Sequence, residues 1–231
     1  MGAEELYIID LFSDRKTSNG LPIGWNELFF KKISAHTEYT VAKEGDNYFI
    51  KAVSNSSASG IYKDIRLDPK EYQIIRWKWR VENTLTKGDA TKKSGDDYPA
   101  RIYITFQYDP ETTGFWERGK YEAYKLIYGE YPPKGAINYI WANRLPKGTS
   151  IDNAYVSKAK MIAVESGGSK VGNWITEERN LYEDYKMLFG EEPSLIKAIA
   201  IMTDTDNTGE SAVAYYDDIV LLKRQDVSRY K

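Results

Sequence analysis

Apolar and polar residues alternate along most of the chain with a period of two, which is the spacing of a β-strand with one buried face. In YQIIRWKWRV this alternation places Ile75, Trp77 and Trp79 on one face and basic residues on the other. The same alternation, or an enrichment in β-branched and aromatic residues, occurs in YTVAKE, NYFIKAV, GIYKDIRL, ARIYITFQYD, AINYIWAN, AKMIAVESG, LIKAIAIMTD and AVAYYDDIVLL. The pattern predicts about nine or ten strands.

Turn-forming residues separate these segments, as in EGDN at 44–47, LDPKE at 67–71 and LPKGT at 145–149. The spacing of the strands is typical of a β-sandwich or a β-barrel. Strands and helices do not alternate, which argues against a parallel α/β sheet. The sequence therefore predicts an all-β, mainly antiparallel fold.

Two segments interrupt the strand pattern and predict helical or loop insertions near 110–135 and 174–190. TEERNLYEDYKMLFG predicts a helix that Thr176 caps and Gly190 ends. GFWERGKYEAYKLIYGEYPP is rich in aromatic residues and predicts a partly helical excursion between two strands. No internal repeat or low-complexity linker divides the sequence, so we expect a single domain over residues 1–231.

Composition limits the class of protein. Of the 231 residues, 42% are hydrophobic and 29% are charged, which suits one folded domain with a sizeable core. The net charge of -2 gives no general attraction to nucleic acid or to anionic lipid. No apolar run approaches the roughly 20 residues of a membrane-spanning helix. We therefore expect neither a nucleic-acid partner nor an integral membrane segment.

The chain has no cysteine and a single histidine, His36. Disulfides, thiolate chemistry and cysteine zinc sites are thereby excluded, and so is a metal centre built from several histidines. We expect His36 to be a partly exposed strand or loop residue.

The first residues, MGAEELYIID, lack the basic start and apolar core of a secretory leader. A periplasmic or extracellular location is expected if a leader has been removed from the natural chain.

The two ends of the chain carry a resemblance in IIDLFSDRKTSNGLPIGWNELFF and AVAYYDDIVLLKR. These segments resemble the first and last strands of jelly-roll sandwiches of the galactose-binding type, a fold shared by many non-catalytic carbohydrate-binding modules. The resemblance implies a jelly-roll β-sandwich. It also implies a structural calcium ion shared by Asp10 and Asp217. A buried Asp217 would need such a partner, because a buried carboxylate must be paired or bound to a metal.

Four further segments carry a second resemblance: KSGDDYPARIYITF, AINYIWAN, WITEERNLYEDYKMLFGEEP and IAIMTDTDNT. From about Trp77 to Ile219 the chain resembles an uncharacterised bacterial family, domain of unknown function 3047. This resemblance implies a fold rather than an activity, because no established reaction or ligand is attached to the family.

An acid-rich hairpin, IAIMTDTDNTGESAVAYYDDIVLL, lies near the end of the chain. Asp204 and Asp206 occupy the first and third positions of a calcium loop. Tyr215 stands where an EF-hand has its bidentate glutamate, and the flanks predict strands, so the pattern argues against an EF-hand. Turn chemistry is the simplest role for these residues. Asp204 and Asp206 remain candidates for a hard cation, and Asp206 and Asn207 for ligand contact.

The stretch SGDDYPAR leads from a polar loop into a strand. We expect an ion pair between Asp97 and Arg101 that fixes the loop. In the alternative interpretation Asp96, Asp97 and Arg101 line a polar pocket, where adjacent carboxylates hydrogen-bond sugar hydroxyls or coordinate a cation.

Tryptophans beside polar residues form a third group of ligand-binding candidates. Trp141 precedes Asn143 and Arg144 at the end of a strand. An exposed indole suits the C–H face of a sugar ring, while amide and guanidinium groups supply hydrogen-bond donors. Because neighbours along a strand point to opposite faces, Trp141 is either a core residue or a ligand platform. Trp174, with Arg179 on the predicted helix, has the same two roles open to it.

Catalysis has support only from carboxylates, and nothing marks one pair among the 34 acids as special. The sequence has no nucleophile elbow, no P-loop and no dinucleotide-binding glycine motif. We therefore expect a non-catalytic binding domain for a carbohydrate or related polyol, with calcium as the candidate cofactor. Two alternatives stay open: an enzyme that acts on polysaccharide through paired carboxylates, and a cell-envelope structural or interaction domain with a protein partner.

Overall fold

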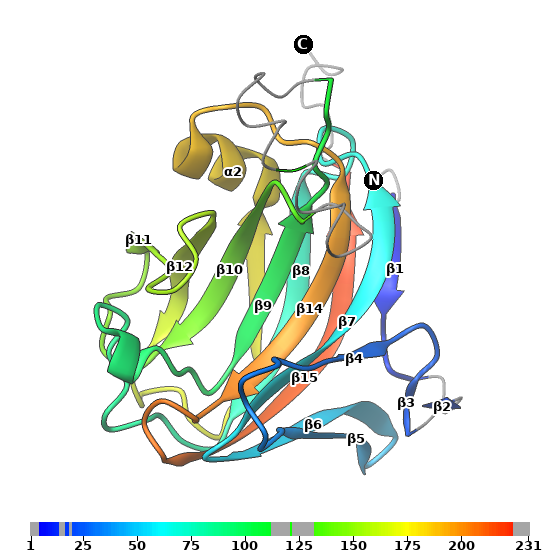
Figure 1. The fold of residues 1–231 in the computed structure, drawn as a ribbon. Helices are drawn as coiled ribbons and strands as arrows, with labels where there is room; N and C mark the ends of the chain where they lie inside the picture. The colour runs from blue at the N-terminus through cyan, green and yellow to red at the C-terminus, as the bar shows by residue number, and fades with distance from the viewer. Residues whose placement is uncertain (1–4, 14–16, 19, 112–120, 122–131, 224–231) are drawn as a thin grey trace.

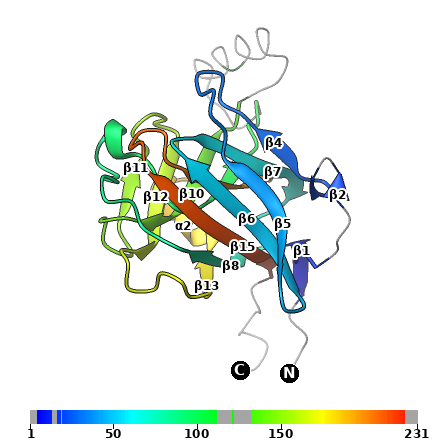
Figure 2. The same cartoon turned by 90° about the horizontal axis from the view of Figure 1, so that it is seen from below.

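The computed structural model describes residues 5–13, 17–18, 20–111, 121 and 132–223, and its frame is two β-sheets that face each other (Figure 1). One sheet has six strands in the order β13–β8–β15–β6–β5, with β1 also paired to β15. Its strands are β1 (Leu6–Asp10), β5 (Glu38–Glu44), β6 (Asn47–Asn55), β8 (Ile74–Val81), β13 (Ile175–Asn180) and β15 (Ser211–Leu222). Figure 2 shows β5, β6, β15 and β8 side by side in this layer.

The other sheet has seven strands in the order β11–β12–β10–β9–β14–β7–β4. Its strands are β4 (Asn26–Leu28), β7 (Ala58–Leu67), β9 (Arg101–Phe106), β10 (Gly135–Ala142), β11 (Ser150–Asp152), β12 (Ala159–Ser166) and β14 (Ile196–Asp204). β10 and β12 run parallel, and the other neighbours in both sheets are antiparallel. A short hairpin joins β2 (Thr17–Ser18) to β3 (Leu21–Pro22).

This architecture confirms the expected jelly-roll β-sandwich with mainly antiparallel pairing. Each of the nine segments that the alternation selected forms a strand. The described residues hold fifteen strands rather than about nine or ten: β2, β3, β4 and β11 have only two or three residues, and β1 and β13 lie outside the nine segments. Two or three residues are too few to produce a recognisable period of two.

The helix predicted from Thr176 begins later than expected. Thr176 belongs to β13, which pairs with β8 along the edge of the six-stranded sheet. Helix α2 (Leu181–Phe189) follows directly, and the side chain of its N-cap residue Asn180 accepts a hydrogen bond of 3.0 Å from the Glu183 N–H. The predicted start was wrong because β8 offers unpaired backbone groups to this segment, and no local pattern reveals such a distant partner.

The end of the predicted helix agrees with the structure. Gly190 follows α2 with a φ of 70°, a left-handed conformation that glycine adopts without steric strain.

In the other expected insertion, residues 112–120 and 122–131 lie outside the described residues. A 3-10 turn, η1 (Lys93–Gly95), precedes β9. No helix in the described part of the chain is both long and apolar enough to span a membrane.

The main hydrophobic core lies between the two sheets and contains a group of fully buried aromatic rings. The ring centroid of Trp77 lies 5.3 Å from those of Trp79 and Tyr139, and Trp79 lies 5.8 Å from Trp141. The rings come from both sheets, so they hold the layers together.

A smaller apolar cluster covers one end of the outer face of the seven-stranded sheet. Its buried members are Ala90, Tyr98, Ile140, Ala142, Met161 and Ala163. β10 therefore has buried residues on both of its faces. The candidate site lies on the remainder of this outer face.

Candidate functional site

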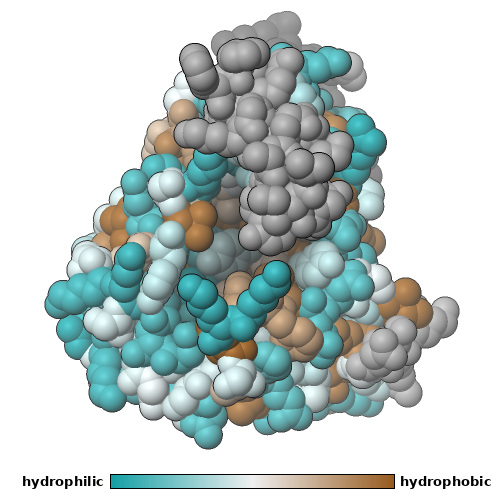
Figure 3. All heavy atoms as spheres, viewed as in Figure 1, coloured by the Kyte–Doolittle hydropathy of each residue, from teal (hydrophilic) through white to brown (hydrophobic). Residues whose placement is uncertain are grey.

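A cleft of about 1320 Å³ lies on the outer face of the seven-stranded sheet. Figure 3 shows the hollow in this face, over the middle of the sheet. β9, β14 and β7 each place alternate side chains in the cleft and direct the others into the core, as in Tyr103 against Ile102 and Ala200 against Ile201. The strand alternation thus builds the cleft and the core from the same strands.

The floor of the cleft is made of small side chains between tyrosine rings. Ala200 lies on β14 opposite Tyr62 of β7 and Tyr103 of β9. Ala198 and Ala136 extend this floor, since each of them lies opposite Thr105. A methyl side chain rises little above the backbone, so the sheet itself forms a flat base with rings on either side.

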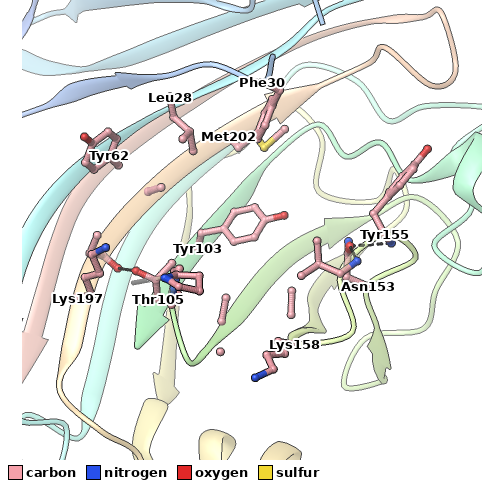
Figure 4. A pocket seen from close by; sticks show the side chains of 18 of the residues that line it. Leu28, Phe30, Tyr62, Tyr103, Thr105, Asn153, Tyr155, Lys158, Lys197 and Met202 are labelled. Atoms are coloured by element: carbon pink, nitrogen blue, oxygen red, sulfur yellow. Dashed lines mark hydrogen bonds between the residues drawn. The ribbon is translucent and has the colours of Figure 1, made fainter. Parts of the chain in front are cut away.

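Residues at the ends of strands and in the adjoining loops form the walls of the cleft (Figure 4). Leu28–Phe30 form one wall after β4, and Asn153–Lys158 form another between β11 and β12. Tyr155 is 55% exposed, so its ring is available at the rim. The charged residues among the lining are Glu27, Asp64, Lys158 and Lys197, two of each sign.

A buried arginine organises one end of the cleft. Arg101 is 3% exposed and lies two residues before Tyr103 on the cleft face of β9. Its Nε donates to Asp204 at 2.7 Å, and a second guanidinium nitrogen contacts the other carboxylate oxygen. Its guanidinium also donates to the hydroxyl of Tyr103 at 3.4 Å and lies 4.5 Å from the ring of Tyr98. The bidentate pair compensates both buried charges.

The expected ion pair between Asp97 and Arg101 is replaced by the pair between Arg101 and Asp204. Asp97 instead accepts hydrogen bonds from the Thr208 N–H at 2.6 Å and from the backbone and side-chain nitrogens of Asn207 at 3.3 and 3.0 Å. Asp204 lies on β14, the neighbour of β9, and this strand order places its carboxylate beside Arg101. Asp97 is thus the acceptor that fixes the turn after β14.

Two further bridges connect this polar end to the cleft wall. The Asp96 carboxylate accepts hydrogen bonds from the Tyr98 hydroxyl at 3.0 Å and from the Asn153 amide at 3.1 Å. The hydroxyl of Tyr155 lies 2.5 Å from the side-chain oxygen of Asn207. The structure therefore brings Asp96, Asp97, Arg101, Asp206 and Asn207 together, although they come from two separate sequence motifs.

The acids at this end form the one group among the described residues with a geometry that could hold a metal ion. Asp97, Asp204 and Asp206 each offer a carboxylate oxygen within 4.8 Å of the others. Burial, together with the charge of Asp97, raises the pKa of Asp206. Oxygen ligands of this kind suit a hard cation. The guanidinium of Arg101 already supplies positive charge to Asp204.

Other candidates from the sequence lie elsewhere. Trp141 is fully buried between the sheets, and its indole donates to the Gly167 carbonyl at 3.0 Å, so it offers no face to a ligand. Of the two roles left open for Trp141, the structure therefore supports the core residue, and β10 is buried on both faces at this end. Asn143 connects two loops, since it accepts from the Leu85 N–H and donates to the Asp97 carbonyl, both at 2.8 Å. The neighbouring Arg144 donates to the Thr86 carbonyl.

Trp174 and Arg179 lie at two further positions away from the cleft. Trp174 is half-buried on the outside of the six-stranded sheet, where the Arg80 guanidinium lies 5.2 Å from its ring. Arg179 donates to Asp184 through two nitrogens at 2.9 and 2.5 Å, and the Tyr139 hydroxyl donates to the same carboxylate at 2.8 Å. The hydrogen bonds of Arg179 and Tyr139 to Asp184 connect α2 to the two sheets.

Asp10 and Asp217, the expected calcium ligands at the chain ends, have separate partners. Asp10 accepts hydrogen bonds from the Trp25 indole at 2.8 Å and the Phe12 N–H at 2.7 Å, and it lies 3.5 Å from the Lys63 ammonium. Asp217 accepts from the Asn47 amide at 2.8 Å and from the N–H of its neighbour at 2.9 Å. Each of the two carboxylates therefore has protein hydrogen-bond donors of its own, and an ion shared by Asp10 and Asp217 stays a prediction.

A second pair of acids lies at the opposite edge of the sandwich and was not singled out from the sequence. Glu165 is bound by Lys170 at 2.6 Å and Lys147 at 3.3 Å. Burial raises the pKa of Glu177, and the charge of Glu165 adds to this effect. Burial also acts on the pKa of Glu165, but hydrogen bonds from Lys170 and the Ser166 N–H outweigh it and lower the pKa.

The cleft residues themselves were also missed, although a signal for them exists. In RIYITF the alternation that directs Ile102 and Ile104 into the core must direct Arg101, Tyr103 and Thr105 to the other face. Polar and aromatic side chains that follow one another on an outer face mark a surface that can bind a ligand.

Solved structures with a similar fold include the carbohydrate recognition domain of Emp47p, with 13% sequence identity, coverage of 94% of this chain and 96% of that chain, and a TM-score of 0.46. A family 12 xyloglucanase from Bacillus licheniformis has 9% identity, coverage of 96% and 100%, and a TM-score of 0.47. Endoglucanase 3 of family GH12 from Trichoderma harzianum has 9% identity, coverage of 96% and 98%, and a TM-score of 0.45. No curated protein matches the chain.

A family model covers most of the sequence. It is described as "Protein of unknown function (DUF3047)" and matches residues 23–220, which confirms the resemblance found in the middle of the sequence. The chain therefore belongs to the DUF3047 family.

Proposed function

We propose that this protein is a non-catalytic binding protein for a carbohydrate or related polyol, and that the ligand lies in the cleft of the seven-stranded sheet. The observation that carries the proposal is the alanine floor between the rings of Tyr62 and Tyr103. Aromatic rings offer apolar faces that suit the C–H face of a sugar. The exposed carboxylate of Asp64 adds a hydrogen-bond acceptor to the lining.

The size of the cleft favours a ligand of several sugar units. Its volume of about 1320 Å³ exceeds the range of roughly 300–1,000 Å³ that is typical of sites for drug-sized molecules. An oligosaccharide fills such a cleft better than a single ring does.

A polysaccharide-acting enzyme is the second candidate, because two carboxylates, Glu27 and Asp64, line the cleft. Hydrolysis requires two acids on opposite sides of the bond, separated by about 5 Å or by about 6.5–9.5 Å. Glu27 lies opposite the core residue Ile61, whereas Asp64 shares the face of Tyr62, so strand alternation directs the two acids to different faces of the sheet. The arrangement therefore favours binding over cleavage.

The experiment is a thermal melt of the purified protein with cellohexaose, xylohexaose, mannohexaose and laminarihexaose. A ligand at 100 times its Kd adds about 2.7 kcal/mol to the free energy of unfolding, which is a measurable shift. Ala200→Leu, which fills the floor, and Tyr62→Ala, which removes a ring, should each abolish the shift. Ala35→Leu, the same change at an exposed position outside the cleft, should preserve it.

The outcomes separate the candidates. A shift that survives both cleft variants would contradict the proposed location of the ligand. Shortened oligosaccharides after incubation, and their loss in Asp64→Asn, would support the enzyme. The absence of a shift with every oligosaccharide would contradict glycan binding and favour a protein partner.

Calcium is a separate proposal for the cluster of Asp97, Asp204 and Asp206, supported by the 4.8 Å grouping of their oxygens. Melts in EDTA and in excess calcium test it. A stabilisation by calcium that Asp206→Asn removes would support an ion at this cluster. A stabilisation removed only by Asp217→Ala would support the ion at the chain ends. Equal melting temperatures would contradict calcium binding at either place.

A further inference from the structure

Asn138 is a fully buried polar residue whose side chain has no hydrogen-bond partner in the described part of the chain. It is 0% exposed, and neither its amide oxygen nor its amide nitrogen is bonded to a described residue. Most buried polar groups in folded proteins are hydrogen-bonded, so an amide with both ends unpaired requires an explanation.

Its position on β10 relates it to the cleft. Asn138 follows Ala136, a floor residue, on the same face of the strand. Across the sheet it lies opposite Tyr103 on β9 and Met161 on β12. Ala200, Tyr103 and Asn138 therefore lie side by side on three neighbouring strands, and Asn138 is the first of them that does not line the cleft.

Asn138 does not line the cleft itself, but Tyr103, which does, lies directly beside it on β9. In Figure 4 the ring of Tyr103 extends from β9 toward the side that carries Asn153. The amide of Asn153 lies 3.6 Å from the sulfur of Met161, directly across from Asn138. In the same loop, the side chains of Tyr155 and Val156 are more than half exposed. Few of the described residues therefore pack against the outer side of this wall.

The chemistry of the amide indicates what it binds. An unpaired buried amide destabilises the folded protein, because it loses its hydrogen bonds to water without replacement. A leucine of similar volume would not have this disadvantage. An asparagine amide both donates and accepts, and a sugar hydroxyl does the same, so the two groups can satisfy each other.

We propose that Asn138 is a specificity-determining residue of the cleft, and that its amide hydrogen-bonds a ligand hydroxyl when Tyr103 and the Asn153 wall shift away from it. The inference rests on the proposed glycan-binding function. It adds an inner polar subsite between β9 and β12.

The test compares Asn138→Leu and Asn138→Ala with the wild type by isothermal titration calorimetry, using the hexasaccharide that gives the largest thermal shift. Both variants should lose affinity by at least about tenfold. Asn138→Leu should also raise the melting temperature of the free protein by about 2–4 °C, because it removes an unpaired amide from the interior. Asn173→Ala, which removes an amide at an exposed position outside the cleft, should keep the affinity within about twofold.

The outcomes distinguish this inference from the proposed function. If Asn138→Ala and the wild type have equal affinity while Ala200→Leu abolishes binding, the inference is wrong and the proposed function stands. If the wild type binds none of the four hexasaccharides, both are wrong. If Asn138→Leu fails to fold, Asn138→Ala decides, because it removes the amide without adding volume.

Discussion

Arg101 shows how a single side chain organises the polar end of the cleft. Its guanidinium connects β9 to β14 through Asp204 and holds the Tyr103 hydroxyl at the edge of the floor. Both partners of the ion pair are almost completely buried. A buried pair contributes little compared with an apolar replacement of both residues, but the loss of one partner leaves the other charge uncompensated.

We predict that Arg101→Met destabilises the protein by about 3–5 kcal/mol, measured by urea denaturation, because Asp204 remains buried without its counter-charge. The double variant Arg101→Met/Asp204→Leu should recover most of this loss. Arg66→Met, at an exposed position on β7, should change the free energy of unfolding by less than about 0.5 kcal/mol. A loss in Arg101→Met no larger than that of the control would contradict the role of the pair.

A second prediction at this scale concerns Glu177 and pH. Burial raises the pKa of Glu177 in the folded protein above its ordinary value of 4.5. The folded state therefore binds this proton more tightly than the unfolded state does. The resulting stabilisation is complete below the ordinary pKa and is lost as the pH rises through the folded-state pKa.

The glutamine of Glu177→Gln does not ionise. This variant therefore does not lose the stability that the wild type loses as the pH rises through the folded-state pKa of Glu177. Its melting temperature, relative to that of the wild type, should therefore be higher at about pH 7 than at about pH 4. Thermal melts across this range make the comparison, with the exposed Glu38→Gln as the control. A difference between Glu177→Gln and wild type that is the same at both pH values would rule out a raised pKa.

The sequence predicted some of the site residues and could not predict how they pair. SGDDYPAR and DTDNTG mark Asp96, Asp97 and Arg101 as one group and the hairpin acids as another by local composition alone. Their meeting depends on β14 lying next to β9, which is a pairing between distant segments. Trp141 shows a second limit, because β10 is buried on both faces and its alternation is uninformative.

Among the elements, β13 and α2 form one unit in which a strand passes directly into a helix. Asn180 ends β13 and caps α2, and the Arg179–Asp184 pair connects the two elements. The sequence predicted the end of the helix from Gly190 but placed its start too early, at Thr176, which lies in β13. Pairing with β8 overrides that local preference.

Asn180→Ala should destabilise the protein by about 1 kcal/mol, within a range of about 0.5–2 kcal/mol, because the first turn of α2 loses its side-chain acceptor. Urea denaturation measures this change. Asn180→Asp, which keeps an acceptor, should be close to the wild type. Met187→Ala, at a 62% exposed position in the same helix, is a control for substitution itself. If Asn180→Ala and Met187→Ala have equal stability, the cap is unimportant.

The whole molecule is a two-layer sandwich in which the face of one sheet carries the cleft. The nine predicted strands and their inward residues follow from the period of two, whereas most of β13 was predicted as helix. The cleft does not follow from this pattern, because its floor needs the order β10–β9–β14–β7. Alanines such as Ala198 and Ala200 mark the floor only once this order is known.

The most direct measurement is a crystal structure of the protein with the hexasaccharide that stabilises it most. We predict density for sugar rings over Ala198 and Ala200, beside Tyr62 and Tyr103, with one hydroxyl reaching the amide of Asn138. Density at a different place, such as the outer face of the six-stranded sheet beside Trp174, with the alanine floor empty, would contradict it.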